Sequence, residues 1–339
     1  MLPKKLRMNY LVNNCTEPYF NMALDEWCLE NLSLEGTVFY LWRNRPSVII
    51  GLNQNAYSEV NIPYLEANGI LLARRVTGGG AVYHDLQNLN YTIIRKLCGS
   101  DNGRDAVGLI AAALQRMGVP AEVSGRNDIT VAGRKVSGFA RRVWKDREII
   151  HGTLMYDVDI DTLTEALNVS GSKLESKGIA SVRSRVANLK SFPGMPSSIE
   201  EFMSALHLML VEGGSEIRIS EENIQEVQRT ATAKFATWDW IFGRSDKADI
   251  VFERRLACGT VGVYVKLDGG IIREMNFRGD FMGALPANRF AEKLVGLRYD
   301  RRILTDAVSE IDPALYFDNA SVRDIVDLIS GGYHEPVLK

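Results

Sequence analysis

The sequence is short of cysteine, of long apolar runs and of any excess of positive charge. Cys15, Cys28, Cys98 and Cys258 have no paired short spacing, so neither a zinc cluster nor a disulfide framework is indicated, and a reducing compartment is the simplest interpretation. No apolar run approaches membrane-spanning length and no signal core follows the basic N-terminal residues, so we expect a soluble, cytoplasmic protein without a membrane partner. The formal net charge of −2 argues against a nucleic-acid partner.

What the chain does contain is a mixture of strand and helix signals over 339 residues, of which 46% are hydrophobic. This length is enough for one large domain and a smaller one. Strands are predicted at 6–12, 37–42, 47–50, 70–73 and 90–94, and helices after Pro18 and at 107–117. Because only four residues separate 37–42 from 47–50, we predict that these two strands pair with each other.

The pattern changes near residues 238–243, where two tryptophans precede the polar segment 244–249. We therefore predict two domains, 1–243 and 250–339. In the second domain, apolar residues alternate over 261–267, and Asp268-Gly269-Gly270 predicts a hairpin turn into 271–277. Helical spacing follows at 290–297, 303–311 and 322–329, so the second domain is predicted to be a small α+β unit.

Three successive glycines, at positions 78–80, follow Arg74 and Arg75. Backbone N–H groups in such a turn can form a concave set of donors, and the two arginines could add charged hydrogen bonds to a phosphate or carboxylate. The segment has neither the Walker ending nor the spacing of the dinucleotide fingerprint. On its own the glycine stretch is equally consistent with a flexible turn.

A second region concentrates positive charge, because seven Lys or Arg and only two Asp lie between residues 126 and 147. Lys135 follows a predicted turn at Gly133. A fixed cation there could lower the repulsion when a carboxylate attacks the α-phosphate of ATP. The alternative is a solvated lysine at a hairpin tip. Asp128 is a candidate ligand for Mg²⁺, with a simple Asn-Asp turn as its alternative.

Histidines and aromatic residues leave further alternatives open. His84 and His151 are either catalytic or metal-binding groups or satisfied structural histidines, since Asp85 is their only carboxylate neighbour in sequence. Trp238, Trp240 and Phe242 are either a ligand platform or packing at the domain boundary.

Five motifs in this order resemble those of the bacterial lipoate-protein ligases. They are RRVTGGGAVYHD at 74–85, SGRND at 124–128, GRKVSGFA at 133–140, HGTL at 151–154 and KGIASVRSRVANL at 177–189. The resemblance extends from NMALDE at 21–26 through WDW at 238–240 and into the second domain. It implies an α+β fold, with a mixed β-sheet and flanking helices in a catalytic domain of the biotin/lipoyl protein ligase type, and a small α+β C-terminal domain.

The resemblance also implies a reaction. Lipoate and MgATP would give lipoyl-adenylate and pyrophosphate, and the acyl group would then pass to a lysine of an acceptor, a lipoyl domain of a 2-oxoacid dehydrogenase or the glycine-cleavage H protein. Water would hydrolyse the adenylate, so the site must close between the two steps. From the boundary near 243–250 and from the resemblance, we expect the C-terminal domain to reorient after adenylation.

Site residues carried over by the resemblance fall into three groups. Lys135 matches the catalytic lysine. The positions matched to ATP and lipoyl-adenylate binding are Arg75, Gly80, Ala81, Val82, Tyr83, Asp128, Lys135, Ser181 and Arg183, with Asp128 also the candidate for Mg²⁺. Those matched to the lipoyl tunnel are Gly79, His84, Ser137, Gly138 and His151.

Three rival functions differ in what they require. An octanoyltransferase of the same superfamily uses a cysteine thioester, and the region that holds the later motifs has no cysteine between Cys98 and Cys258. A lipoyltransferase that uses preformed lipoyl-adenylate shares the motifs. A sensor that binds lipoate or its adenylate without catalysis would not need Lys135.

Overall fold

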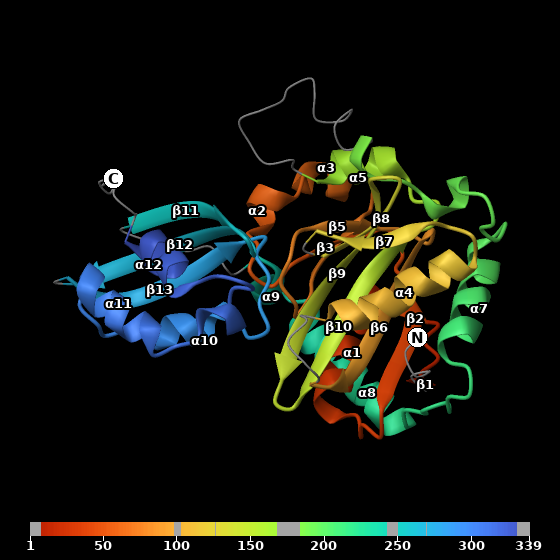
Figure 1. Cartoon of the computed structure of the whole chain (residues 1–339), viewed down its shortest axis with the longest axis horizontal. Helices are drawn as coiled ribbons and strands as arrows, with labels where there is room; N and C mark the ends of the chain where they lie inside the picture. Colours follow the sequence, from red (N-terminus) through yellow and green to blue (C-terminus); the bar gives the residue numbers. More distant parts are fainter. Residues whose placement is uncertain are drawn as a thin grey trace.

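The computed structural model describes residues 8–97, 103–125, 127–167, 184–242, 250–268 and 270–330. These residues form a larger and a smaller body, joined side by side (Figure 1). The larger body is a mixed sheet flanked by helices together with a second, smaller sheet, and the smaller body is a three-stranded sheet with helices. The predicted α+β class is confirmed.

The larger body is built on a seven-stranded sheet in the order β1-β2-β6-β10-β9-β8-β7. Its strands are β1 (Met8–Tyr10), β2 (Thr37–Trp42), β6 (Asn88–Lys96), β7 (Ala121–Ser124), β8 (Asp128–Val131), β9 (Arg134–Trp144) and β10 (Arg147–Met155). Only β1 and β2 pair in parallel. Alternate residues of β2 enter different cores, Phe39 on one face and Tyr40 on the other, so both faces of the sheet are covered.

Helices supply that cover on each face. α4 (Arg104–Arg116) and α7 (Ile199–Leu210) pack on one face, while α1 (Pro18–Asn31), α8 (Glu221–Thr230) and the π-helical η2 (Ala231–Phe235) pack on the other. Ser198 caps α7 by accepting from Glu201 N, whereas the Glu201 carboxylate accepts from Ser197. The α1, α4, α7 and α8 helices follow the apolar spacing in the sequence.

The smaller sheet of this body has β3 (Ser47–Ile50) between β4 (Leu71–Arg74) and β5 (Val82–His84). Its outer face carries α2 (Ala56–Glu59), α3 (Ile62–Ala67), α5 (Ile160–Ala166) and α9 (Trp238–Ile241). The predicted pairing of 37–42 with 47–50 is therefore wrong. The link between them does not close a hairpin, because Asn44 bonds to Asn21 and His84 and the Arg45 amide donates to Thr16 O.

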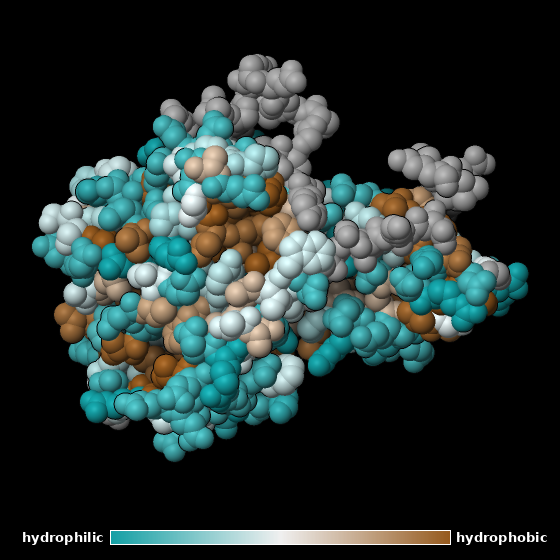
Figure 2. Space-filling view, turned by 180° about the vertical axis from the view of Figure 1, so that it is seen from behind, coloured by the Kyte–Doolittle hydropathy of each residue, from teal (hydrophilic) through white to brown (hydrophobic). Residues whose placement is uncertain are grey.

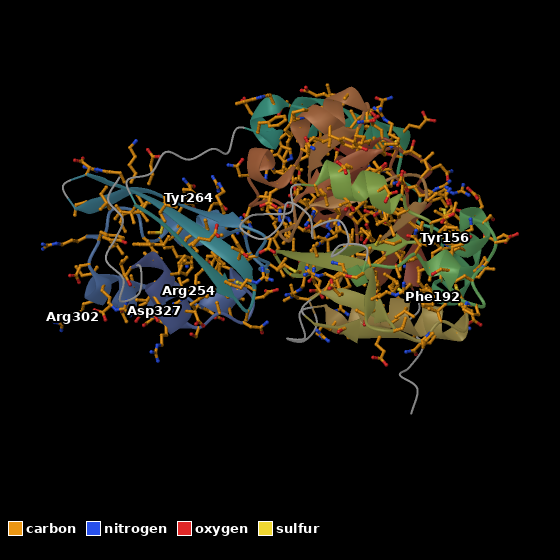
Figure 3. The ribbon with its side chains drawn as sticks, turned by 90° about the horizontal axis from the view of Figure 1, so that it is seen from above. Tyr156, Phe192, Arg254, Tyr264, Arg302 and Asp327 are labelled. Atoms are coloured by element: carbon orange, nitrogen blue, oxygen red, sulfur yellow. The ribbon has the colours of Figure 1, made fainter. Side chains whose placement is uncertain are left out.

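The smaller body has the sheet β11-β12-β13, made of β11 (Ile250–Leu256), β12 (Gly259–Asp268) and β13 (Ile271–Gly279). The helices α10 (Ala287–Glu292), α11 (Arg301–Ser309) and α12 (Val322–Ile329) pack against it, and 3₁₀ turns occur at η3 (Pro313–Leu315) and, in the larger body, at η1 (Leu189–Ser191). The predicted hairpin is confirmed, and so are the helices at 303–311 and 322–329 to within two residues, whereas α10 ends at Glu292 and covers only the first part of the predicted 290–297. On the smaller body, Arg254 and Asp327 lie together, on the opposite side of the molecule from Tyr156 and Phe192 (Figure 3).

Within the described residues, three backbone hydrogen bonds join the two bodies. Gly79 N donates to Phe281 O at 3.0 Å, Gly279 N to Asn53 O at 3.0 Å and Val143 N to Ala284 O at 2.7 Å. From behind, polar surface covers much of both bodies, and apolar surface gathers mainly on the larger one (Figure 2). No helix among the described residues is long and apolar enough to cross a membrane.

Candidate active site

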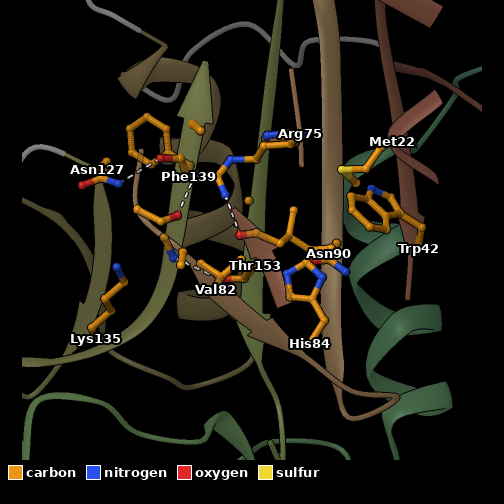
Figure 4. Close-up of a pocket in the computed structure, with 17 residues that line it drawn as sticks. Met22, Trp42, Arg75, Val82, His84, Asn90, Asn127, Lys135, Phe139 and Thr153 are labelled. Atoms are coloured by element: carbon orange, nitrogen blue, oxygen red, sulfur yellow. Dashed lines mark hydrogen bonds between the residues drawn. The ribbon is translucent and has the colours of Figure 1, made fainter. Parts of the chain in front are cut away.

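A cavity lies where the smaller sheet of the larger body faces β6, β9 and β10 (Figure 4). It encloses about 560 Å³ of empty space, its open mouth included. Its lining comes from α1, both sheets and the glycine loop: Met22, Trp42, Ile49, Arg75, Gly80, Ala81, Val82, His84, Asn90, Asn127, Lys135, Gly138, Phe139, Ala140, His151, Gly152 and Thr153. The two glycine-and-cation regions of the sequence thus meet in one place.

The cavity is chemically asymmetric. Lys135 lies on one side of it, while Met22 and Trp42 lie on the opposite side, next to His84 and Asn90 (Figure 4). A space with a cation at one end and apolar walls at the other fits an acid with an apolar chain better than a uniformly polar molecule.

Lys135 is positioned by the β8–β9 hairpin. Its Nζ lies 2.8 Å from Oδ1 of Asp128, and its side chain is 37% exposed. A Cβ at Gly138 would lie 2.9 Å from that Nζ, so glycine leaves the room through which the lysine side chain passes. The lysine is therefore held in an ion pair beside the cavity and is not a fully solvated hairpin tip.

Arg75 holds the shape of the glycine loop. Its guanidinium donates to Thr77 Oγ1 and to the carbonyls of Ile49, Gly78 and Gly80, and burial lowers its pKa to about 10. Gly79 has φ +88°, and its amide is already bonded across to the smaller body. The loop thus presents the arginine's positive charge to the cavity from a rigid frame.

Arg74 does not contribute to the cavity, contrary to the prediction that it supplements Arg75. It is completely buried, and its donors reach the carbonyls of Gly51, Leu52, Gln54, Trp240 and Ile241. Trp240 returns a hydrogen bond from Nε1 to Arg74 O and packs edge-on against Phe235. These contacts pack Trp240 within the larger body. Trp238, in contrast, is 60% exposed and stacks on Phe242.

A buried carboxylate, Asp25 of α1, orients His151. His151 Nδ1 lies 2.6 Å from Asp25 Oδ2, and its Nε2 lies 2.7 Å from Thr77 Oγ1. Asp25 Oδ1 also accepts from Tyr40 and Thr92. Because a carboxylate only accepts, His151 carries a proton on Nδ1 and donates it to Asp25. His151 is thus connected through Thr77 to Arg75 and the glycine loop.

His84 has a different environment. Asn44 Nδ2 lies 3.1 Å from its Nδ1, and its Nε2 is buried with no hydrogen-bond partner among the described residues. Burial, followed by the charges of Arg75 and His151, lowers its pKa to about 3. The cavity is therefore lined by a neutral imidazole.

The predicted site residues divide into three sets. Those that line the cavity are Arg75, Gly80, Ala81, Val82, His84, Lys135, Gly138 and His151. Gly79, Tyr83, Asp128 and Ser137 lie beside the lining without being part of it, and Ser181 and Arg183 fall outside the described residues. The sequence reasoning missed Asp25, Met22, Trp42 and Asn90 as site residues, although the first two lie in the NMALDE segment that carries part of the resemblance.

Known proteins match the chain over most of its length. A family model described as the lipoyl protein ligase A/B catalytic domain matches residues 17–210, and one described as the bacterial lipoate protein ligase C-terminus matches residues 245–329. Lipoate-protein ligase LplJ of Bacillus subtilis is 39% identical over 323 residues, which cover 93% of this chain and 98% of that protein.

Solved structures agree with this match. A bipartite lipoate protein ligase of Thermoplasma acidophilum, studied together with its E2 lipoyl domain, is 30% identical with a TM-score of 0.65, covering 71% of this chain and 98% of that chain. A lipoate-protein ligase A bound with ATP is 28% identical with a TM-score of 0.62, covering 70% and 99%. This chain belongs to the lipoate-protein ligase family.

Proposed function

We propose that the protein is an ATP-dependent lipoate-protein ligase, which converts lipoate to lipoyl-adenylate and transfers the lipoyl group to a lysine of an acceptor protein. The observation that carries this proposal is the position of Lys135 at one end of a cavity whose other end carries Met22 and Trp42. The carboxylate of lipoate would lie toward Lys135, and its chain would extend toward Met22 and Trp42. The relatives' names and the ATP-bound ligase support both substrates.

In the first half-reaction, a carboxylate oxygen of lipoate attacks the α-phosphorus of ATP, and the bond to the β-phosphate breaks to release pyrophosphate. Two anions must approach for this step. Lys135 would lie between them, and its ammonium would reduce their repulsion and stabilise the charge that builds up on the α-phosphate. Arg75 and the backbone from Gly80 to Tyr83 would face the phosphates from the glycine loop.

Asp128 is the residue that we propose for Mg²⁺. No group of three or more His, Cys, Asp or Glu side chains suited to a metal occurs within the described ranges, which fits an ion that arrives with the nucleotide. Mg²⁺ is commonly held by one or two carboxylates and phosphate oxygens, so a lone carboxylate paired with Lys135 fits that pattern. When bound, the ion would neutralise phosphate charge.

In the second half-reaction, the ε-amine of the acceptor lysine attacks the acyl carbon, AMP leaves, and the amine loses a proton. We propose lipoyl domains of 2-oxoacid dehydrogenases and the glycine-cleavage H protein as acceptors. The E2 lipoyl domain studied with the Thermoplasma ligase supports the first of these. We also propose a cytoplasmic location, which agrees with the free thiols of Cys15 and Cys28.

Lipoate-dependent exchange of labelled pyrophosphate into ATP tests the first half-reaction. We expect exchange in the wild type and a loss of at least about 100-fold in Lys135→Ala, since a fixed charge at the reacting centre is removed. Arg134→Ala, which removes the neighbouring exposed cation on β9, is the matched control and should retain exchange. A wild type that shows no exchange but transfers the lipoyl group from synthetic lipoyl-adenylate would instead be the lipoyltransferase, and one that does neither would be the sensor.

A further inference from the structure

A second cavity lies at the contact between the two bodies, and we call it the seam cavity. It encloses about 760 Å³ of empty space, its open side included. Its lining comes from α1, β9, η2 and α9 of the larger body and from β13 and α10 of the smaller one: Glu26, Leu52, Asn53, Arg142, Lys234, Trp240, Asn276, Phe277, Arg278, Pro286, Asn288 and Arg289. None of these residues lines the candidate active site.

The seam cavity concentrates positive charge in a chain whose net charge is −2. Four cationic side chains, Arg142, Lys234, Arg278 and Arg289, line it together with one carboxylate, Glu26. Glu26 bonds to Lys234 through both oxygens at 2.7 Å and lies 3.7 Å from Arg142. The single carboxylate therefore leaves a surplus of positive charge among the residues that line the cavity.

Arg142 is the most constrained of these cations. Its side chain is 13% exposed, and its Nε is buried without a hydrogen-bond partner in the part of the chain that the structure describes. Burial is the main cause that lowers its pKa; Glu26 and Glu30 oppose that lowering, and the nearby charge of Arg289 adds to it. A buried guanidinium with an unused donor, next to another arginine, is stabilised when an anion binds between them.

The remaining lining also favours an anion. Asn53, Asn276 and Asn288 bring side-chain amides that can donate hydrogen bonds to an anion. Among the described residues that line the cavity, Glu26 is the one that carries a negative charge. The Lys234 ammonium is held over the Trp240 ring at 4.5 Å, which fixes its position before any ligand arrives. A guanidinium group can bind two oxygens of one phosphate at once. Several cations that converge on one cavity suit a small ion that carries several negative charges.

We propose that the seam cavity is a second anion site, which binds a di- or triphosphate group, either as inorganic pyrophosphate or as part of a nucleotide. Such an anion would contact Arg142 and Lys234 of the larger body and Arg278 and Arg289 of the smaller one. Because both bodies supply cations, the bound phosphate strengthens their contact. The site is separate from the reacting centre and goes beyond the proposed ligase activity, since its binding step needs no turnover.

Calorimetric titration of the full-length protein tests this site. Pyrophosphate and ATP are titrated separately into Lys135→Ala protein, in which the candidate active site is weakened, and into the same protein with a second substitution. We expect Arg289→Ala to weaken binding of at least one of the two by 10-fold or more, and Arg289→Glu to abolish it. Arg302→Ala removes an exposed arginine from the far end of the same body and should change binding less than 2-fold (Figure 3).

The ligand whose binding depends on Arg289 identifies the source of the phosphate. As a second measurement, that ligand should raise the melting temperature of the otherwise wild-type chain more than that of Arg289→Ala. Equal binding by the Arg289 and Arg302 variants would overturn the proposal, and so would the absence of binding by either phosphate. A synthetic polyglutamate peptide that binds through Arg289 while neither phosphate does would also overturn it, in favour of an acidic protein partner.

Discussion

His84 illustrates how a single residue is set by its surroundings. Its folded-state pKa of about 3 lies below the usual value of 6.5, because burial and two neighbouring cationic groups disfavour the imidazolium. In the unfolded chain the ring takes up a proton near pH 6.5. Because the unfolded chain binds this proton more readily than the folded one, the free energy of unfolding decreases as the pH falls from about 6.5 toward 3, and His84 does not lower it above that range.

Substitution of this histidine should change the acid side of the stability profile. Between pH 6.5 and 4, we expect the free energy of unfolding of the wild type to fall by up to about 1.4 kcal/mol per pH unit more than that of His84→Gln. Urea unfolding at three pH values measures this difference. His207→Gln is the control, because His207 is only half-buried and should flatten the profile less. Parallel profiles for the wild type and His84→Gln would contradict the pKa argument.

At the scale of single residues, the sequence indicates which residues belong to the candidate site better than it indicates which residues they contact. Arg74 and Arg75 look equivalent in the sequence, but side chains alternate in direction at the end of β4. Arg74 therefore bonds to the carbonyl of Ile241, whereas Arg75 bonds to the glycine loop at Gly78. Asp25 and His151 are 126 positions apart, and no local pattern links them. Their contact exists only after α1 packs on the sheet, and for that reason the sequence does not reveal it.

One buried carboxylate ties several elements of the larger body together. Glu148 of β10 is 1% exposed and accepts from Arg95 Nε of β6 at 2.6 Å and from Arg141 Nε of β9 at 2.5 Å. Arg95 also pairs through both terminal nitrogens with Asp105 in the first turn of α4. Three strands and a helix therefore depend on the same charge network.

Loss of the central charge should be costly. Glu148→Gln leaves two arginines near an uncharged amide in a buried place, and we expect it to lower the free energy of unfolding by about 3–5 kcal/mol. Asp268→Asn is the matched control, because Asp268 pairs with Arg273 where both side chains are more than half exposed, and it should cost no more than about 1 kcal/mol. Urea unfolding compares the two. Equal costs would show that the network adds nothing to the stability of the sheet.

Local spacing predicted the elements better than it predicted which strands pair. The helices α4, α7 and α12 follow apolar residues at helical intervals, and the β12–β13 hairpin follows its turn, so sequence reasoning found them. It missed β11, whose residues 253–255 are all charged and exposed. It also paired β2 with β3, because the contacts that separate them are made by Asn44 with α1 and β5.

At the scale of the whole molecule, the sequence predicts two domains, and the structure shows which residues of the larger and the smaller body contact each other. The glycine loop that faces the candidate active site also contacts the smaller body, through the hydrogen bond from Gly79 N to Phe281 O. Any reorientation of the C-terminal domain after adenylation must break this contact. The sequence could not show the connection, because a hydrogen bond between two backbone groups does not reveal its partner in the residue types.

Gly78→Ala should weaken this contact specifically. A Cβ at position 78 would lie 2.6 Å from Phe281 O, a backbone atom that cannot move alone, so the smaller body must shift at a cost of about 1–3 kcal/mol to the contact. Gly80→Ala is the control, since its Cβ would lie 3.9 Å from Asp280 Cβ in ordinary contact. Small-angle scattering should show a larger radius of gyration for Gly78→Ala alone. Identical scattering from both variants and the wild type would mean that the loop does not hold the two bodies together.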